Sequence, residues 1–102
     1  MQNSKIKLLQ EAKKHYANEG FNIIGLFGSY ARGEATPQSD IDILYELNEK
    51  FIKAYSGFLA FSRLNEIKEE LKKLFGVDVD ISAKSGLSRT AQKYIMRDLK
   101  YV

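Results

Sequence analysis

The chain has 102 residues, 44% hydrophobic and 28% charged, with a formal net charge of +3, and this size predicts one domain over residues 1–102. It contains no cysteine, which excludes disulfides and thiolate metal sites and favours a reducing compartment. No basic-then-apolar leader opens the chain and no apolar run reaches the ~20 residues needed to span a membrane, so we expect a cytoplasmic protein without membrane contact.

The hydrophobic pattern predicts alternating helices and strands. In chain order it predicts a helix over Ser4–Glu19, a strand over Phe21–Phe27, a helical turn over Tyr30–Gly33 and a loop over Thr36–Ser39. It then predicts a strand over Asp40–Tyr45, a helix over Phe51–Phe75, a strand over Val77–Ile81 and a final amphipathic helix from Leu87 to Leu99. This order indicates the α/β (α+β) class, with helices packed on one short mixed β-sheet.

Two aspartates on the second predicted strand form the first candidate site. Residues two apart in a strand point to the same side, so Asp40 and Asp42 present both carboxylates on one face. Paired carboxylates repel unless a cation lies between them, and oxygen ligands suit Mg²⁺ or Mn²⁺. The pattern recurs at Asp78 and Asp80, and one of these joins the first pair if the two strands are neighbours. The alternative is a solvated strand face without a ligand.

Gly28-Ser29 follows the first predicted strand, where the chain turns into a helical turn. Glycine lets backbone N–H groups approach a phosphate, a helix start favours negative charge, and the Ser29 hydroxyl adds a donor. Arg32, about one turn later, can reach the same phosphates as a planar fork. The structural alternatives are that Ser29 is only a helix N-cap and that Arg32 pairs with Glu34 or an aspartate.

Gly28-Ser29-Tyr30-Ala31-Arg32-Gly33, followed by Ser39-Asp40-Ile41-Asp42-Ile43, resembles the signature of the DNA polymerase β-like nucleotidyltransferase superfamily. With its short length, the chain is similar to the minimal nucleotidyltransferases of that superfamily. The resemblance implies the polymerase β-like fold over 1–102, with Gly28 and Ser29 on the triphosphate. It further implies two metal ions held by Asp40, Asp42 and a third carboxylate. Asp80 fits the third position better than Asp78, because Val79-Asp80-Ile81 has the apolar flanks of the family pattern.

The resemblance implies a Mg²⁺-dependent enzyme that moves AMP from ATP to an acceptor. Minimal members commonly act as antitoxins beside a helical RNase toxin of the HEPN class, on which they modify a tyrosine. We therefore expect a cognate HEPN-type toxin as partner, in a hetero-complex or an oligomer. The runner-up is an antitoxin that neutralises its partner by binding alone. A third possibility is transfer to a small molecule of the aminoglycoside type, for which 102 residues leave little room to build an acceptor pocket.

Two further features have an open interpretation. The stretch from Phe51 to Phe61 carries more apolar side chains than one core-facing stripe needs, so it is either a broad buried face or a partner-binding patch. Four basic residues follow one another on the last predicted helix at spacings of four, four and three: Arg89, Lys93, Arg97 and Lys100. Such a stripe is usually only solvated, which is the interpretation we favour, and the alternative is contact with an acidic partner or RNA.

Overall fold

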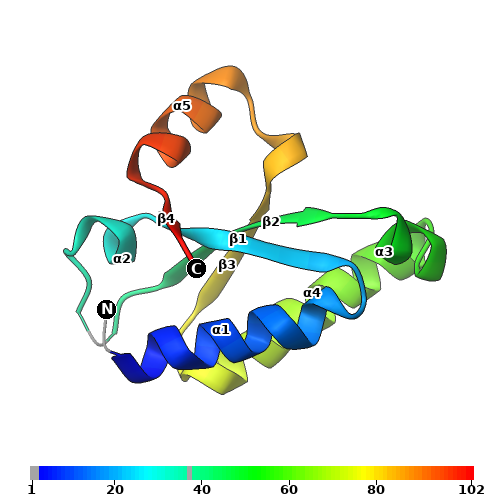
Figure 1. Ribbon diagram of the computed structural model, residues 1–102, viewed down its shortest axis with the longest axis horizontal. Helices are drawn as coiled ribbons and strands as arrows, with labels where there is room; N and C mark the ends of the chain where they lie inside the picture. Colours follow the sequence, from blue (N-terminus) through cyan, green and yellow to red (C-terminus); the bar gives the residue numbers. More distant parts are fainter. Residues whose placement is uncertain (1–2, 37) are drawn as a thin grey trace.

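The computed structural model describes residues 3–36 and 38–102. Its elements run α1 (Asn3–Ala17), β1 (Phe21–Phe27), α2 (Ser29–Arg32), β2 (Ile41–Leu47), α3 (Glu49–Ala54), α4 (Phe58–Phe75), β3 (Val79–Ala83), the short 3₁₀ helix η1 (Lys84–Gly86), α5 (Arg89–Asp98) and β4 (Lys100–Tyr101). The predicted α+β class with a mixed sheet is confirmed (Figure 1). Met1, Gln2 and Pro37 lie outside the described residues. Pro37 belongs to the predicted loop, and Met1 and Gln2 belong to the N-terminal segment in which no leader was expected.

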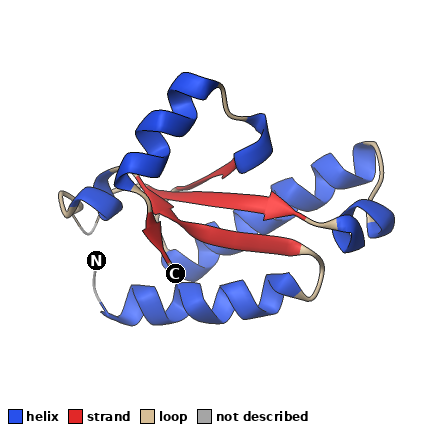
Figure 2. Ribbon diagram, turned by 45° about the horizontal axis from the view of Figure 1, so that its top comes forward, coloured by secondary structure: helices blue, strands red, loops and turns tan. Residues whose placement is uncertain are grey.

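The four strands form one sheet in the order β3-β2-β1-β4. β1 pairs antiparallel with β2 and β4, whereas β2 and β3 are parallel. Helices α1 and α4 cover one face of this sheet, and α5 lies on the other side (Figures 1 and 2). Parallel neighbours need a crossover connection, which the α3–α4 segment supplies between β2 and β3. No helix among the described residues is long and apolar enough to cross a membrane.

The core lies between the sheet and the α1–α4 layer. The fully buried side chains of this core come from α1, α3, α4 and strands β1 to β3, namely Leu9, Phe21, Ile23, Leu26, Ile41, Ile43, Phe51, Ile67, Leu71 and Val79. The burial of Ile41 and Ile43 fixes which face of β2 points inward, because side chains alternate along a strand. The intervening Asp42 is therefore directed to the side of the sheet on which α5 lies.

The single helix predicted over Phe51–Phe75 is wrong, because the chain forms α3 and α4 with a break between them. Tyr55 adopts an extended backbone with φ −131° and ψ 110°, and Gly57 has φ 59°, a left-handed value that favours glycine. Three smaller differences concern strands. β2 spans Ile41–Leu47 and not the predicted Asp40–Tyr45, so Asp40 lies just before the strand. β3 begins two residues later than predicted, and the two-residue strand β4 was not predicted.

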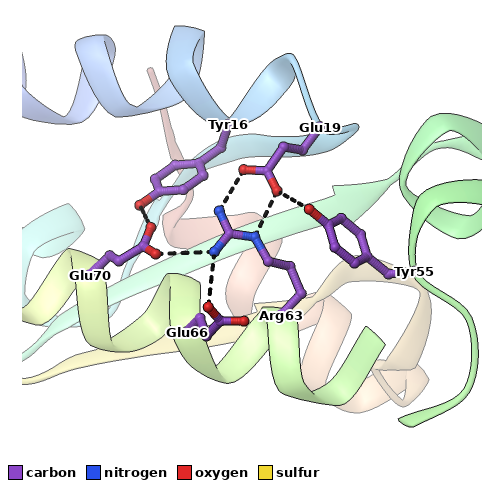
Figure 3. A network of polar contacts seen from close by, with 6 residues as sticks. All are labelled: Tyr16, Glu19, Tyr55, Arg63, Glu66 and Glu70. Carbon is purple, nitrogen blue, oxygen red and sulfur yellow. Dashed lines mark hydrogen bonds and ion pairs between the residues drawn. The ribbon is translucent and has the colours of Figure 1, made fainter. Parts of the chain in front are cut away.

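A polar network joins α1 to α4 at the edge of the core (Figure 3). The Arg63 guanidinium donates to both carboxylate oxygens of Glu19, at 2.7 and 2.6 Å, and to Glu70 at 3.0 Å. Tyr16 donates to the other Glu70 oxygen at 2.6 Å. The bond to Glu19 is the main cause that raises the pKa of Arg63, and the bond from Arg63 is the main cause that lowers the pKa of Glu19. Arg63 thus holds two carboxylates from separate elements.

We expect Arg63→Ala to lower the free energy of unfolding by about 2–4 kcal/mol, because both glutamates then lose the cation that compensates their desolvation. The pKa of Glu19 and of Glu70 is lowered in the fold, so this stabilisation is present above the unfolded glutamate pKa of about 4.3 and is lost as the pH falls below it. Chemical denaturation at neutral and acidic pH measures both effects. The control is Lys53→Ala, which removes an exposed ion pair with Glu49 at 3.9 Å and should cost under about 1 kcal/mol. Equal losses of stability in both variants would contradict the assignment of Arg63 as a stabilising partner of Glu19 and Glu70.

Candidate functional site

Three aspartates gather where β2 and β3 begin. Asp40 immediately precedes β2, Asp42 is its second residue, and the parallel register sets Asp42 beside Asp80 on β3. Neighbouring strands lie about 4.8 Å apart, so these two side chains stand next to each other on the same face. Asp78 lies one residue before β3. The sheet therefore brings together the three carboxylates singled out in the sequence.

The electrostatics of Asp42 follow from this crowding. Burial raises the pKa of the Asp42 carboxyl, and the negative charges of Asp80 and Asp40 raise it further, while Arg32 acts in the opposite direction. A raised carboxyl pKa means that the ionised form is disfavoured where it stands. The three carboxylates therefore repel one another in the absence of a compensating cation.

The donor set fits a hard divalent cation by its chemistry, because all its ligands are carboxylate oxygens. Across residues 3–36 and 38–102, no three acidic or histidine side chains already surround a common ion position. Asp80 Oδ1 instead lies 3.7 Å from Nζ of Lys68 on α4, with 68% of the Asp80 side chain exposed. Exposed pairs of this kind contribute at most about 1 kcal/mol, so Lys68 is a weak competitor for Asp80.

The turn between β1 and α2 passes directly against Asp42. Gly28 has φ 74° and ψ −150°, a backbone conformation that residues other than glycine rarely adopt. A Cβ built on Gly28 would collide with Oδ2 of Asp42. Gly28 itself is the N-cap of α2, and no side chain caps the helix. The N-cap alternative for Ser29 is therefore wrong, and its partly buried side chain lies at the first helical position.

Arg32 is exposed at the end of α2 and contacts carboxylates. Its Nε donates to Glu34 Oε2 at 3.2 Å, and its Nη1 lies 4.0 Å from Asp98 Oδ2 on α5. The structure thus shows the pairing alternative that the sequence left open. Both contacts are solvent-exposed and weak, so Arg32 remains able to exchange them for another anion.

A cleft along α5 adjoins this turn, and sequence reasoning did not place it there. One cavity of about 410 Å³ lies between Gly28, Arg32 and the α5 residues Tyr94, Arg97 and Asp98. A second cavity of about 580 Å³ shares two of these residues and is lined by Arg89, Thr90, Lys93, Tyr94 and Arg97. We call the two together the α5 cleft. The signal in the sequence was the basic stripe, of which Arg89, Lys93 and Arg97 lie on α5, whereas Lys100 belongs to β4 and not to the helix as predicted. The position of α5 beside Gly28 depends on β4, which carries α5 back to the sheet.

The aromatic stretch at the α3–α4 junction is divided between the core and the surface. Phe51 is fully buried, whereas four other side chains point outward: Ile52 at 59% exposed, Phe58 at 90%, Leu59 at 60% and Phe61 at 76%. We call these four the α3–α4 patch. Of the two interpretations left open by the sequence, an outward apolar patch describes most of this segment.

Comparisons of the sequence and of the structure with known proteins all match nucleotidyltransferases. A family model described as "Nucleotidyltransferase domain" matches residues 6–102. The "Protein adenylyltransferase MntA" of Thermococcus cleftensis is 37% identical over 99 residues, covering 95% of this chain and 92% of that protein. A solved structure named "Structure of putative minimal nucleotidyltransferase" matches with a TM-score of 0.72 and 29% identity, over 100% of this chain and 97% of the other. A second, "Crystal structure of the toxin-antitoxin with AMP-PNP", has a TM-score of 0.63 and 25% identity, over 97% and 69%.

Proposed function

Because the chain belongs to the nucleotidyltransferase domain family, we propose that it is a protein adenylyltransferase that moves AMP from ATP onto a protein acceptor. One observation carries this proposal: the Gly28 turn lies against Asp42, which stands beside Asp80 in register. A glycine turn of the kind that lets backbone N–H groups approach a phosphate is thereby adjacent to the carboxylate patch formed by Asp40, Asp42 and Asp80. We further propose that residues 1–102 form one such domain, since the family model spans nearly the whole chain.

We assign the site residues as follows. Gly28 and Ser29 bind the triphosphate, with Arg32 leaving Glu34 to contact a phosphate oxygen. Asp40, Asp42 and Asp80 hold two Mg²⁺ ions, for which Mn²⁺ can substitute. When bound, these ions offset the repulsion among the carboxylates and stabilise charge on the triphosphate.

In the reaction, an acceptor hydroxyl oxygen bonds to the α-phosphorus of ATP, the bond from that phosphorus to the bridging oxygen breaks, and pyrophosphate leaves. Asp80 is exposed and lies on the edge strand β3, so an incoming acceptor hydroxyl can reach its carboxylate. We assign it the acceptance of the hydroxyl proton. Ser29 and the Gly28 backbone orient the leaving pyrophosphate.

For the acceptor, we propose a cognate toxin of the HEPN class, modified on tyrosine, with this chain as its antitoxin in a hetero-complex. Support comes from the similar solved structure, which is a toxin–antitoxin with AMP-PNP. The α3–α4 patch offers the apolar surface that a stable protein partner requires. Tyrosine hydroxyl is compatible with the open carboxylate patch, because Asp80 is not enclosed by the chain.

The α3–α4 patch also favours a second candidate function, in which the chain neutralises the toxin by contact alone. Four large apolar side chains on one exposed segment are more than a purely catalytic surface needs. The two functions differ in what inactivation of the carboxylates does to neutralisation.

The direct test incubates the purified chain with Mg²⁺, ATP labelled at the α-phosphate and lysate of its host. We expect covalent label on one protein band, and no label with Asp40→Asn/Asp42→Asn or after chelation of the metal. The labelled band, identified by mass spectrometry, names the acceptor and the modified residue. A labelled band that persists in the double variant would refute the assignment of Asp40 and Asp42.

A matched pair of variants separates the two functions. Asp40→Asn/Asp42→Asn should still co-purify with the toxin but fail to neutralise it, whereas Phe58→Ser/Phe61→Ser should weaken co-purification. If the aspartate variant neutralises the toxin as well as the wild type does, binding alone is the function. Both phenylalanines are largely exposed, so their replacement leaves the core intact.

A further inference from the structure

The α5 cleft is strongly basic. Three of its five lining residues in the larger cavity are Arg89, Lys93 and Arg97, and none is acidic. They are spaced four residues apart, so they follow one face of α5. From residue 83 onward the chain carries five basic residues and one acidic residue, a net charge of +4. Because the whole chain has a net charge of +3, residues 1–82 carry a net charge of −1. Such a concentration of positive charge is typical of surfaces that bind polyanions.

These charges are largely uncompensated. Within the part of the chain that the structure describes, Arg89 and Lys93 form no ion pair within 4.0 Å, and Arg97 approaches only Asp98, at 3.9 Å and with 71% of its side chain exposed. Three neighbouring cations on one helix face repel one another. An anionic ligand in the cleft would remove that repulsion.

The position of Tyr94 favours nucleic acid over an acidic peptide as the ligand of the cleft. It belongs to the apolar stripe of the helix, yet it is 61% exposed and lines both cavities. The Arg97 guanidinium lies 5.5 Å from the centre of its ring. An exposed aromatic ring between cations is the arrangement on which nucleobases stack while Lys and Arg contact the phosphates. An acidic peptide would use the cations but would give the exposed part of the ring no stacking partner.

We propose that the α5 cleft binds single-stranded nucleic acid, with one base stacked on Tyr94 and the phosphates on Arg89, Lys93 and Arg97. The smaller cavity continues from Arg97 to Gly28, so one end of a bound strand points toward the candidate active site. The proposal goes beyond the transfer of AMP and does not depend on it, because binding is measured without ATP or metal.

Fluorescence anisotropy with a labelled RNA of about 12 nucleotides tests the proposal, since single-strand sites span about 4–16 nucleotides. We expect Tyr94→Ala to weaken binding about 5- to 150-fold, the range of one lost base stack. Arg89→Glu/Lys93→Glu should weaken binding further and flatten the salt dependence, because fewer phosphates are neutralised. DNA of the same sequence separates RNA from single-stranded DNA as the ligand, and a duplex should bind less tightly than either strand.

The matched control is Lys7→Glu/Lys14→Glu, which makes the same change in net charge at exposed positions of α1. It should bind nearly as well as the wild type. Three results would overturn the proposal: equal losses in the control and in the α5 variants, no effect of Tyr94→Ala, or displacement of the RNA by polyglutamate as readily as by unlabelled RNA. The exposure of Tyr94 means that its replacement leaves folding intact, which a melting curve verifies.

Discussion

Asp42→Asn is expected to abolish transfer of AMP while making the metal-free protein more stable. The amide has the shape of the carboxylate but cannot compensate a divalent cation, so we expect activity to fall by on the order of 10³-fold, about 4 kcal/mol of transition-state stabilisation. The partly buried Asp42 carboxylate stands beside Asp80 and near Asp40, which disfavour its charge. Its neutralisation should therefore raise the free energy of unfolding by up to about 1 kcal/mol.

Label transfer and denaturant unfolding in a chelating buffer measure the two halves of this prediction. The matched control is Asp78→Asn, because Asp78 has a 76% exposed side chain and lies 3.9 Å from Lys72 outside the carboxylate patch. It should change neither quantity appreciably. If Asp42→Asn destabilises the metal-free protein, or if Asp78→Asn costs as much activity, the carboxylate patch has been assigned incorrectly.

Gly28→Ala should damage both stability and activity. The new methyl group would occupy the position of the Asp42 carboxylate, at a left-handed φ of 74° that alanine rarely adopts. We expect a loss of about 2–4 kcal/mol in the free energy of unfolding. Displacement of Asp42 by even about 1 Å should also reduce activity about 100-fold.

Gly33 provides an unusually close control for this substitution. It has the same φ of 74°, but a Cβ built on it would have no neighbour within 4 Å. Gly33→Ala should therefore cost only the backbone strain, about 1 kcal/mol, and leave transfer intact. The difference between the two variants reports the crowding between Gly28 and Asp42 together with the backbone strain at Gly28, whose ψ of −150° is less accessible to alanine than the ψ of 17° at Gly33. Equal effects in both would show that this crowding has no consequence for the site.

The parts of the fold that local pattern determines were predicted well. β1 matches its predicted span, because a seven-residue, mostly apolar run ends just before Gly28. β3 was placed two residues early, since Val77 and Val79 continue the same alternation and local periodicity cannot show where pairing begins. The structure pairs β3 from Val79 onward, and the backbone carbonyl of Asp78 accepts a hydrogen bond from the Ile41 backbone N–H at 2.9 Å.

The parts that tertiary contacts determine were not predictable. The break between α3 and α4 depends on Tyr55, whose hydroxyl donates to Glu19 on a distant segment at 2.7 Å. β4 has only two residues, and it is a strand because Gly25 leaves room for the Lys100 backbone against β1. The aspartate pair and Gly28 were identified by spacing, whereas the convergence of Asp80 with them required the order of the strands.

The attachment of α5 has a consequence for access to the site. α5 has no buried residue, and it connects β3 at one edge of the sheet to β4 at the other through a ladder of two residues. Segments with so few buried contacts open at free energies well below that of global unfolding. The amide hydrogens of α5 and β4 should therefore exchange with solvent long before those of β1 and β2. The wall of the cleft beside Gly28 can thus detach and reseat while the carboxylates on the sheet stay fixed, so a bulky acceptor can enter without unfolding the core.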